Sequence, residues 1–117
     1  MRVAALVPDL LFGSKVTGAL RQAGHEVELA TSGAESWTPP ADADVVLIDL
    51  VSAGPGGIAV LERIRASPAT GARTLAVYSH VDAQMRRDAV EAGFDLVIPR
   101  SRMMREGAEL IAKLGKA

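Results

Sequence analysis

The chain has 117 residues and a mass of 12.2 kDa, which is enough for one compact domain and too little for two of ordinary size. Hydrophobic residues make up 49% and charged residues 23%, a balance typical of a folded globular domain. The net charge of -1 gives no support for nucleic-acid binding through bulk positive charge. The absence of cysteine excludes disulfides, thiol nucleophiles and thiolate metal sites.

The residues near the N-terminus and the rarity of aromatic side chains exclude further classes of protein. Pro8 and Asp9 interrupt the first apolar run, so we expect neither a signal peptide nor a membrane-spanning helix. An aromatic content of 3% counts against a platform that stacks single-stranded bases. We therefore expect a single cytoplasmic domain, residues 1–117, that binds neither membrane nor nucleic acid directly.

Five short apolar segments are predicted to be strands. Residues 3–7 and 45–48 are continuous apolar runs, typical of strands that are buried on both faces of a parallel sheet. The other three predicted strands cover residues 27–30, 74–78 and 96–98. A segment able to form a helix follows each strand. This alternation predicts a parallel sheet with helices on both faces and right-handed crossovers.

Five helices are predicted between and after these strands. Apolar residues recur at helical spacing in the segments 16–23, 61–64, 85–92 and 103–114. Only a short helix, over residues 33–37, fits between the second and third strands, because Pro39 and Pro40 end it. We expect the glycine-rich residues 54–57 to form a loop and Ser101 to cap the last helix.

Polar residues follow the predicted strands, at the sheet edge where open α/β folds bind their ligands. Asp9 follows the first strand and Asp49 the third, while Ser79 follows the fourth and Arg100 the fifth. Two carboxylates and the loop carbonyl of Val51 are sufficient protein ligands for Mg²⁺. An aspartate can accept a phosphoryl group when such an ion offsets the negative charge, and a hydroxyl and a cation can bind the phosphoryl oxygens.

Over nearly its whole length, the chain resembles the receiver domain of two-component response regulators. The resemblance rests on the order and spacing of several segments: VVLIDL with Asp49, LERIR, Ser79, VEAGFD, and QAGHEVELATSG early in the chain. It implies a single flavodoxin-like (βα)5 domain, doubly wound, with a parallel sheet of strand order 2-1-3-4-5. It also implies that Asp49 is the phosphoacceptor, Asp9 a metal-site acid and Ser79 the hydroxyl that responds to phosphorylation.

The function that the resemblance implies is two-component signal transduction, and not enzyme catalysis. Asp49 of a stand-alone receiver would accept a phosphoryl group from a histidine kinase or phosphotransfer protein with the help of Mg²⁺. The output would pass to a downstream protein through the face made by the fourth helix, the fifth strand and the fifth helix. Receivers often pair through that face, so a homodimer is a further expectation.

Departures from the family pattern keep two alternatives open. The family has two adjacent acids where this chain has Pro8 and Asp9, and a lysine where it has Arg100. These changes favour a pseudo-receiver, an adaptor that binds proteins without being phosphorylated. The other alternative, a flavodoxin-like domain that binds a nucleotide or flavin, lacks support because residues 9–12 do not form a phosphate-cradling loop. Trp37 would fill a gap in the core or serve as an exposed binding anchor.

Overall fold

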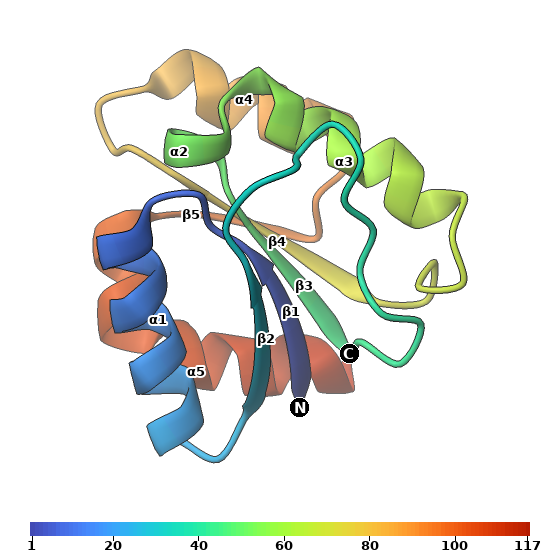
Figure 1. Cartoon of the computed structure of the whole chain (residues 1–117). Helices are drawn as coiled ribbons and strands as arrows, with labels where there is room; N and C mark the ends of the chain where they lie inside the picture. The colour runs from blue at the N-terminus through green and yellow to red at the C-terminus, as the bar shows by residue number, and fades with distance from the viewer.

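The computed structural model describes residues 1–117 and consists of one five-stranded sheet covered by helices (Figure 1). All strand pairs are parallel, and the strand order is β2-β1-β3-β4-β5. The strands are β1 (Arg2–Leu6), β2 (Glu26–Ala30), β3 (Val45–Asp49), β4 (Arg73–Tyr78) and β5 (Leu96–Pro99). The predicted flavodoxin-like architecture is therefore confirmed, and the predicted strands differ from the observed ones by only one or two residues at their ends.

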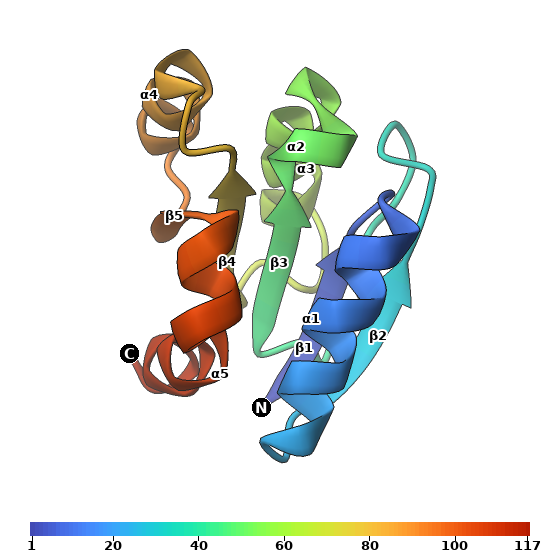
Figure 2. The ribbon, with the colours of Figure 1, turned by 90° about the vertical axis from the view of Figure 1, so that its left-hand side faces the viewer.

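Five helices cover the two faces of the sheet. The helices are α1 (Leu10–Gln22), α2 (Leu50–Ala53), α3 (Pro55–Arg65), α4 (Ala83–Ala92) and α5 (Arg100–Lys116). Figure 2 shows α1 and α5 in front of the sheet and α3 behind it, with the short helix α2 at the upper end of β3. None of the helices combines the length and the apolar character that crossing a bilayer requires.

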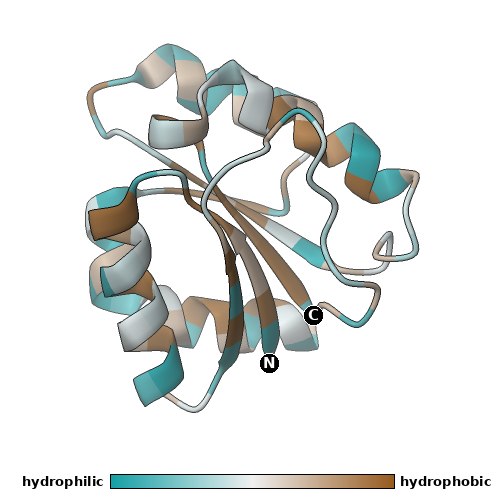
Figure 3. Ribbon diagram, viewed as in Figure 1, coloured by the Kyte–Doolittle hydropathy of each residue, from teal (hydrophilic) through white to brown (hydrophobic).

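Two apolar layers form the core, one on each face of the sheet. Alternate residues of β1 enter different layers, since Val3 and Ala5 pack with α1 and α5 while Leu6 packs with α3. Strand β3 is buried along its whole length, as expected for a central strand of a parallel sheet. The brown strands in Figure 3 show this continuous hydrophobicity, which fixes the sheet between its two helical layers.

The connection between β2 and β3 contains no helix, so the helix predicted over residues 33–37 is wrong. The chain makes a turn there, with the Trp37 amide donating to the Gly33 carbonyl. Arg63 of α3 donates to the carbonyls of Ala34 and Trp37. Helix formation fails because Pro39 and Pro40 follow so closely that too few residues remain for a stable helix. The Trp37 side chain is partly buried against the core layer that contains α3, which favours the gap-filling role.

Two smaller expectations about helix starts are also wrong. Residues 54–57 do not form a loop, because α3 begins at Pro55, directly after Gly54 with its positive φ of 66°. Gly57 permits close packing there, since a Cβ atom at this position would lie 2.7 Å from Leu50 Cδ2. Ser101 does not cap α5, because the helix begins one residue earlier, at Arg100, and has no side-chain cap.

Candidate functional site

Two aspartates lie at the carboxyl edge of the sheet, where adjacent strands β1 and β3 end. The Asp9 carboxylate caps α1 by accepting from the amides of Leu11 at 3.0 Å and Phe12 at 3.1 Å. Asp49 caps α2 in the same way, and its Oδ2 accepts from Ser52 Oγ at 2.6 Å and from the Ser52 amide at 3.3 Å. Both acids therefore contribute to local structure as well as to any site.

Arg100, the first residue of α5, lies between these two carboxylates. Its Nε donates to Asp49 Oδ1 at 3.2 Å and its Nη2 to Asp49 Oδ2 at 2.5 Å. The third nitrogen, Nη1, lies 3.3 Å from Asp9 Oδ2. The guanidinium carbon also lies 4.1 Å from the centre of the Phe12 ring, a cation–π contact. One planar cation thus binds both acids and an aromatic face.

Asp9 and Asp49 differ in how far their side chains are buried. The Asp49 side chain is 0% exposed, whereas 36% of the Asp9 side chain and 27% of the Arg100 side chain are exposed. A carboxylate out of water must be paired and hydrogen-bonded, and Asp49 accepts four hydrogen bonds, two from Ser52 and two from Arg100. Three of these bonds go to Oδ2 and one goes to Oδ1, so every oxygen of the buried carboxylate has a partner.

Electrostatics keep the exposed partners of Asp49 charged. The amide of Phe12, together with Arg100, holds the pKa of Asp9 below its usual value. The hydrogen bond and charge of Asp49, with a further contribution from Asp9, raise the pKa of the Arg100 guanidinium. Asp9 and Arg100 are therefore ionised at neutral pH, and their attraction is present under ordinary conditions.

The structure brings together three of the five residues that the sequence singled out, namely Asp9, Asp49 and Arg100. Ser79 and Val51 lie at the same edge of the sheet, after β4 and β3. Neither side chain bonds to the two acids or to Arg100, and Ser79 contributes only a backbone carbonyl that accepts from the Asp82 amide at 2.8 Å. The predicted site is thus a compact ion-pair cluster with two of its expected members at its margin.

The arrangement does not fit Mg²⁺ in this conformation. No group of three or more acidic, histidine or cysteine side chains is placed to hold a metal ion. The guanidinium of Arg100 already lies against both carboxylates that would share the ion. An ion between Asp9 and Asp49 would require the Arg100 side chain to leave.

Two contributors to the site were not foreseen from the sequence. Ser52 lies three residues after Asp49, a spacing that lets a capping acid reach the amide in the first helical turn. That spacing could have identified it. Phe12 carries no such signal, since its ring reaches Arg100 only through the packing of α1 against α5.

A second feature of this edge is a set of exposed hydrophobic side chains, here called the apolar rim: Leu10, Leu11, Val51 and Val81. Their exposed fractions are 70%, 68%, 43% and 78%. Each residue closely follows the carboxyl end of β1, β3 or β4, three strands that are neighbours in the sheet. The rim therefore borders the ion-pair cluster.

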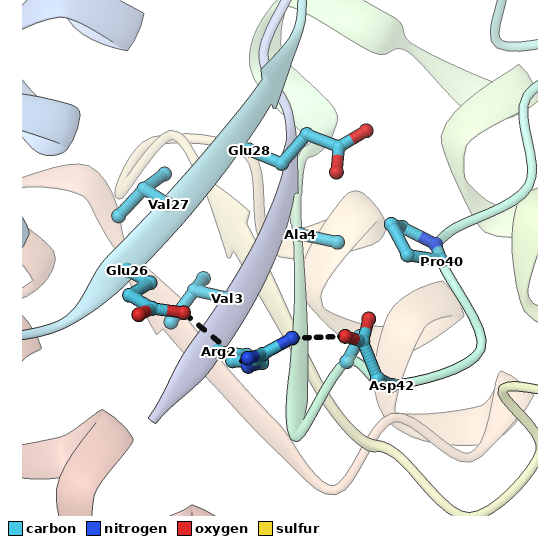
Figure 4. A pocket seen from close by; sticks show the side chains of 9 residues that line it. Arg2, Val3, Ala4, Glu26, Val27, Glu28, Pro40 and Asp42 are labelled. Carbon is cyan, nitrogen blue, oxygen red and sulfur yellow. Dashed lines mark hydrogen bonds and ion pairs between the residues drawn. The ribbon is translucent and has the colours of Figure 1, made fainter.

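A hollow away from this edge lies near the amino ends of β1 and β2 (Figure 4). It has a volume of about 190 Å³, and its walls are β1, β2 and the loop that replaces the predicted helix. Arg2 crosses it and pairs with Glu26 and Asp42. The hollow contains none of the predicted site residues, so the candidate site is the carboxyl edge.

Comparison with known proteins supports the fold. No protein-family model matches the chain, and no curated protein is similar to it in sequence. Its structure resembles a response regulator from Thermotoga maritima, with a TM-score of 0.79 and 20% identity over 99% of this chain and 98% of that chain. The chain has the flavodoxin-like fold of response-regulator receiver domains.

Two further structures show that proteins described in different terms share this fold. A putative pilus assembly-related protein from Burkholderia pseudomallei has a TM-score of 0.78 and 17% identity, over 99% of this chain and 90% of that chain. A response regulator from the same organism, with a phosphorylated aspartic acid, a calcium ion and citrate, has a TM-score of 0.69 and 14% identity, over 96% of this chain and 71% of that chain. The function must therefore be argued from the site.

Proposed function

We propose that this chain is a signalling adaptor that binds another protein at the carboxyl edge of its sheet. The observation that carries the proposal is the apolar rim around the ion-pair cluster. Six large hydrophobic side chains of the chain are well exposed, and four of them form the rim. A cluster of exposed apolar groups at one edge is typical of an interaction site, whereas scattered ones need no explanation.

The charge beside the rim indicates the chemistry of the partner. Asp9 is partly exposed and Asp82 is exposed, while the charge of Arg100 is already paired with two acids. The edge therefore presents a negative centre within an apolar border. A partner helix that carries leucines beside lysine or arginine would complement both features.

An amphipathic leucine–lysine peptide is a suitable probe of this edge. In amide NMR spectra, we expect the peptide to shift Leu10, Leu11, Val51 and Val81, because burial of apolar area stabilises the complex and lysine complements the acids. The double variant Leu10→Ser/Leu11→Ser should lose most of this binding. The same peptide with glutamate in place of lysine should bind much more weakly.

Val90 provides a matched control, because it is an exposed hydrophobic residue on α4 and lies outside the rim. Val90→Ser should leave binding of the peptide unchanged. If instead the shifts map to α4 and α5 and Val90→Ser abolishes them, the rim is not the binding surface. That result would favour the face of the fourth and fifth helices that the family resemblance implies, which is also where a homodimer would form.

A phosphoacceptor receiver is the second candidate function. The observation in its favour is the place of Asp49, at the carboxyl end of the central strand β3 and beside a cation. In this role a histidine kinase or phosphotransfer protein would be the partner, and Mg²⁺, Ser79 and Val51 would complete the site. Exposure to the small-molecule phosphodonor acetyl phosphate, followed by intact-protein mass spectrometry, tests it: a mass increase that Asp49→Asn abolishes would establish the phosphoacceptor role.

A further inference from the structure

We infer that Arg100 is a built-in counter-ion that takes the place of a divalent metal, so that Asp49 serves as a structural carboxylate and not as a phosphoacceptor. The inference rests on the proposed function, because an adaptor that binds proteins needs no chemistry at Asp49. It adds that the Arg100 ion pairs hold the site in one arrangement, which needs neither a metal ion nor a phosphoryl group.

The bonding of Asp49 carries the first step. To attack phosphorus, a carboxylate oxygen needs a free lone pair and an open approach. Both Asp49 oxygens are bound by Arg100, Oδ2 is also bound by Ser52, and the side chain is 0% exposed. An incoming phosphoryl group would have to displace a bond from Arg100, either the 3.2 Å bond from Nε at Oδ1 or the 2.5 Å bond from Nη2 at Oδ2.

The position of the charge carries the second step. A dication shared by Asp9 and Asp49 would lie directly against the guanidinium, and like charges at contact distance in a partly buried site repel strongly. Removing the side chain instead would sacrifice the contacts to both acids and the stacking on Phe12. Arg100 supplies one positive charge where the ion would supply two, and it is tethered to the chain.

The choice of arginine carries the third step. A lysine would place a single point charge near Asp49, whereas the guanidinium forms a planar fork that fits a carboxylate with two parallel bonds. Its third nitrogen reaches Asp9, and its face lies on the buried Phe12 ring. The surroundings therefore hold this particular side chain in place from three directions.

The test is a titration of the wild-type chain with millimolar Mg²⁺ and then beryllofluoride, followed by amide NMR. We expect no saturable shifts at Asp9, Asp49 or Val51. The Arg100→Ala variant should gain shifts at these positions, because two freed carboxylates then bind the ion. Saturable Mg²⁺ shifts at Asp9 and Asp49 in the wild type would overturn the inference, as would beryllofluoride shifts that Asp49→Asn abolishes.

Controls separate the role of Arg100 from a general effect of losing an arginine. Arg102 lies two residues further along α5 in a surface pair with Glu106, and Arg102→Ala should behave like the wild type. If Arg100→Ala does not fold, Arg100→Lys serves in its place, and the wild-type titration decides the question by itself. The peptide experiment needs no metal, so the binding function and this inference can fail independently.

Discussion

Two arginines each bind two acids at opposite ends of the same sheet. Arg100 binds Asp9 and Asp49 at the carboxyl edge, and Arg2 binds Glu26 and Asp42 beside the hollow in Figure 4. Their surroundings differ greatly, since 60% of the Arg2 side chain is exposed but only 27% of the Arg100 side chain. Each cluster thus consists of one arginine and two acids, but the cluster of Arg100 is much less exposed to water than that of Arg2.

The comparison shows that burial decides what such a cluster does. Two unit charges about 4 Å apart attract by roughly 1 kcal/mol in water and roughly 4 kcal/mol at the effective dielectric near a protein surface. The Arg2 cluster belongs to the first case, because its acids are 75% and 60% exposed. Asp49 is buried, so loss of Arg100 would leave its charge with neither a counter-charge nor water to stabilise it.

Replacing Arg100 should have the largest effect. Arg100→Ala leaves the buried Asp49 carboxylate without its counter-charge, so we expect the free energy of unfolding to fall by about 3 kcal/mol. Urea unfolding monitored by circular dichroism would measure this change. Arg102→Ala is the control and should cost less than about 1 kcal/mol, as usual for an exposed helical pair. Equal losses in the two variants would contradict the difference in burial.

Acid should weaken the carboxyl-edge cluster through Asp9. Its pKa is lowered in the folded state, by the Phe12 amide and by Arg100, so its stabilising contribution is present above the ordinary aspartate pKa of about 4. The contribution is lost as the pH falls through the lower folded value. We expect the stability difference between wild type and Asp9→Asn to be constant near neutral pH and to shrink below about pH 4. Urea unfolding across this range would show whether the difference grows instead.

Arg2 should give the smallest effect. Arg2→Ala removes two exposed ion pairs, so the free energy of unfolding should fall by less than about 1 kcal/mol, and salt should reduce even this difference. Unfolding in low and high sodium chloride measures both. A loss as large as that of Arg100→Ala would mean that the number of paired acids, and not burial, determines the stabilisation.

Much of the fold could be predicted because the strands are short apolar runs with helical segments between them. The segment 31–44 could not be predicted in detail, because its turn depends on Arg63, a residue of a distant helix. For the site, the rule that parallel strands end at one edge correctly brought Asp9, Asp49 and Arg100 together. Their pairing was not predictable, because the direction of a long side chain depends on tertiary packing such as the Phe12 ring beside it.

The ion-pair cluster also bears on the order of events in folding. Arg100 and Asp49 are 51 residues apart, and β4 lies between their strands β5 and β3 in the sheet. The pair can form only after β4 and β5 have docked, so we expect this long-range contact to form late in folding. Contacts made after the folding transition state act mainly on the unfolding rate. The cluster should therefore lengthen the lifetime of the native state while leaving the rate of folding nearly unchanged.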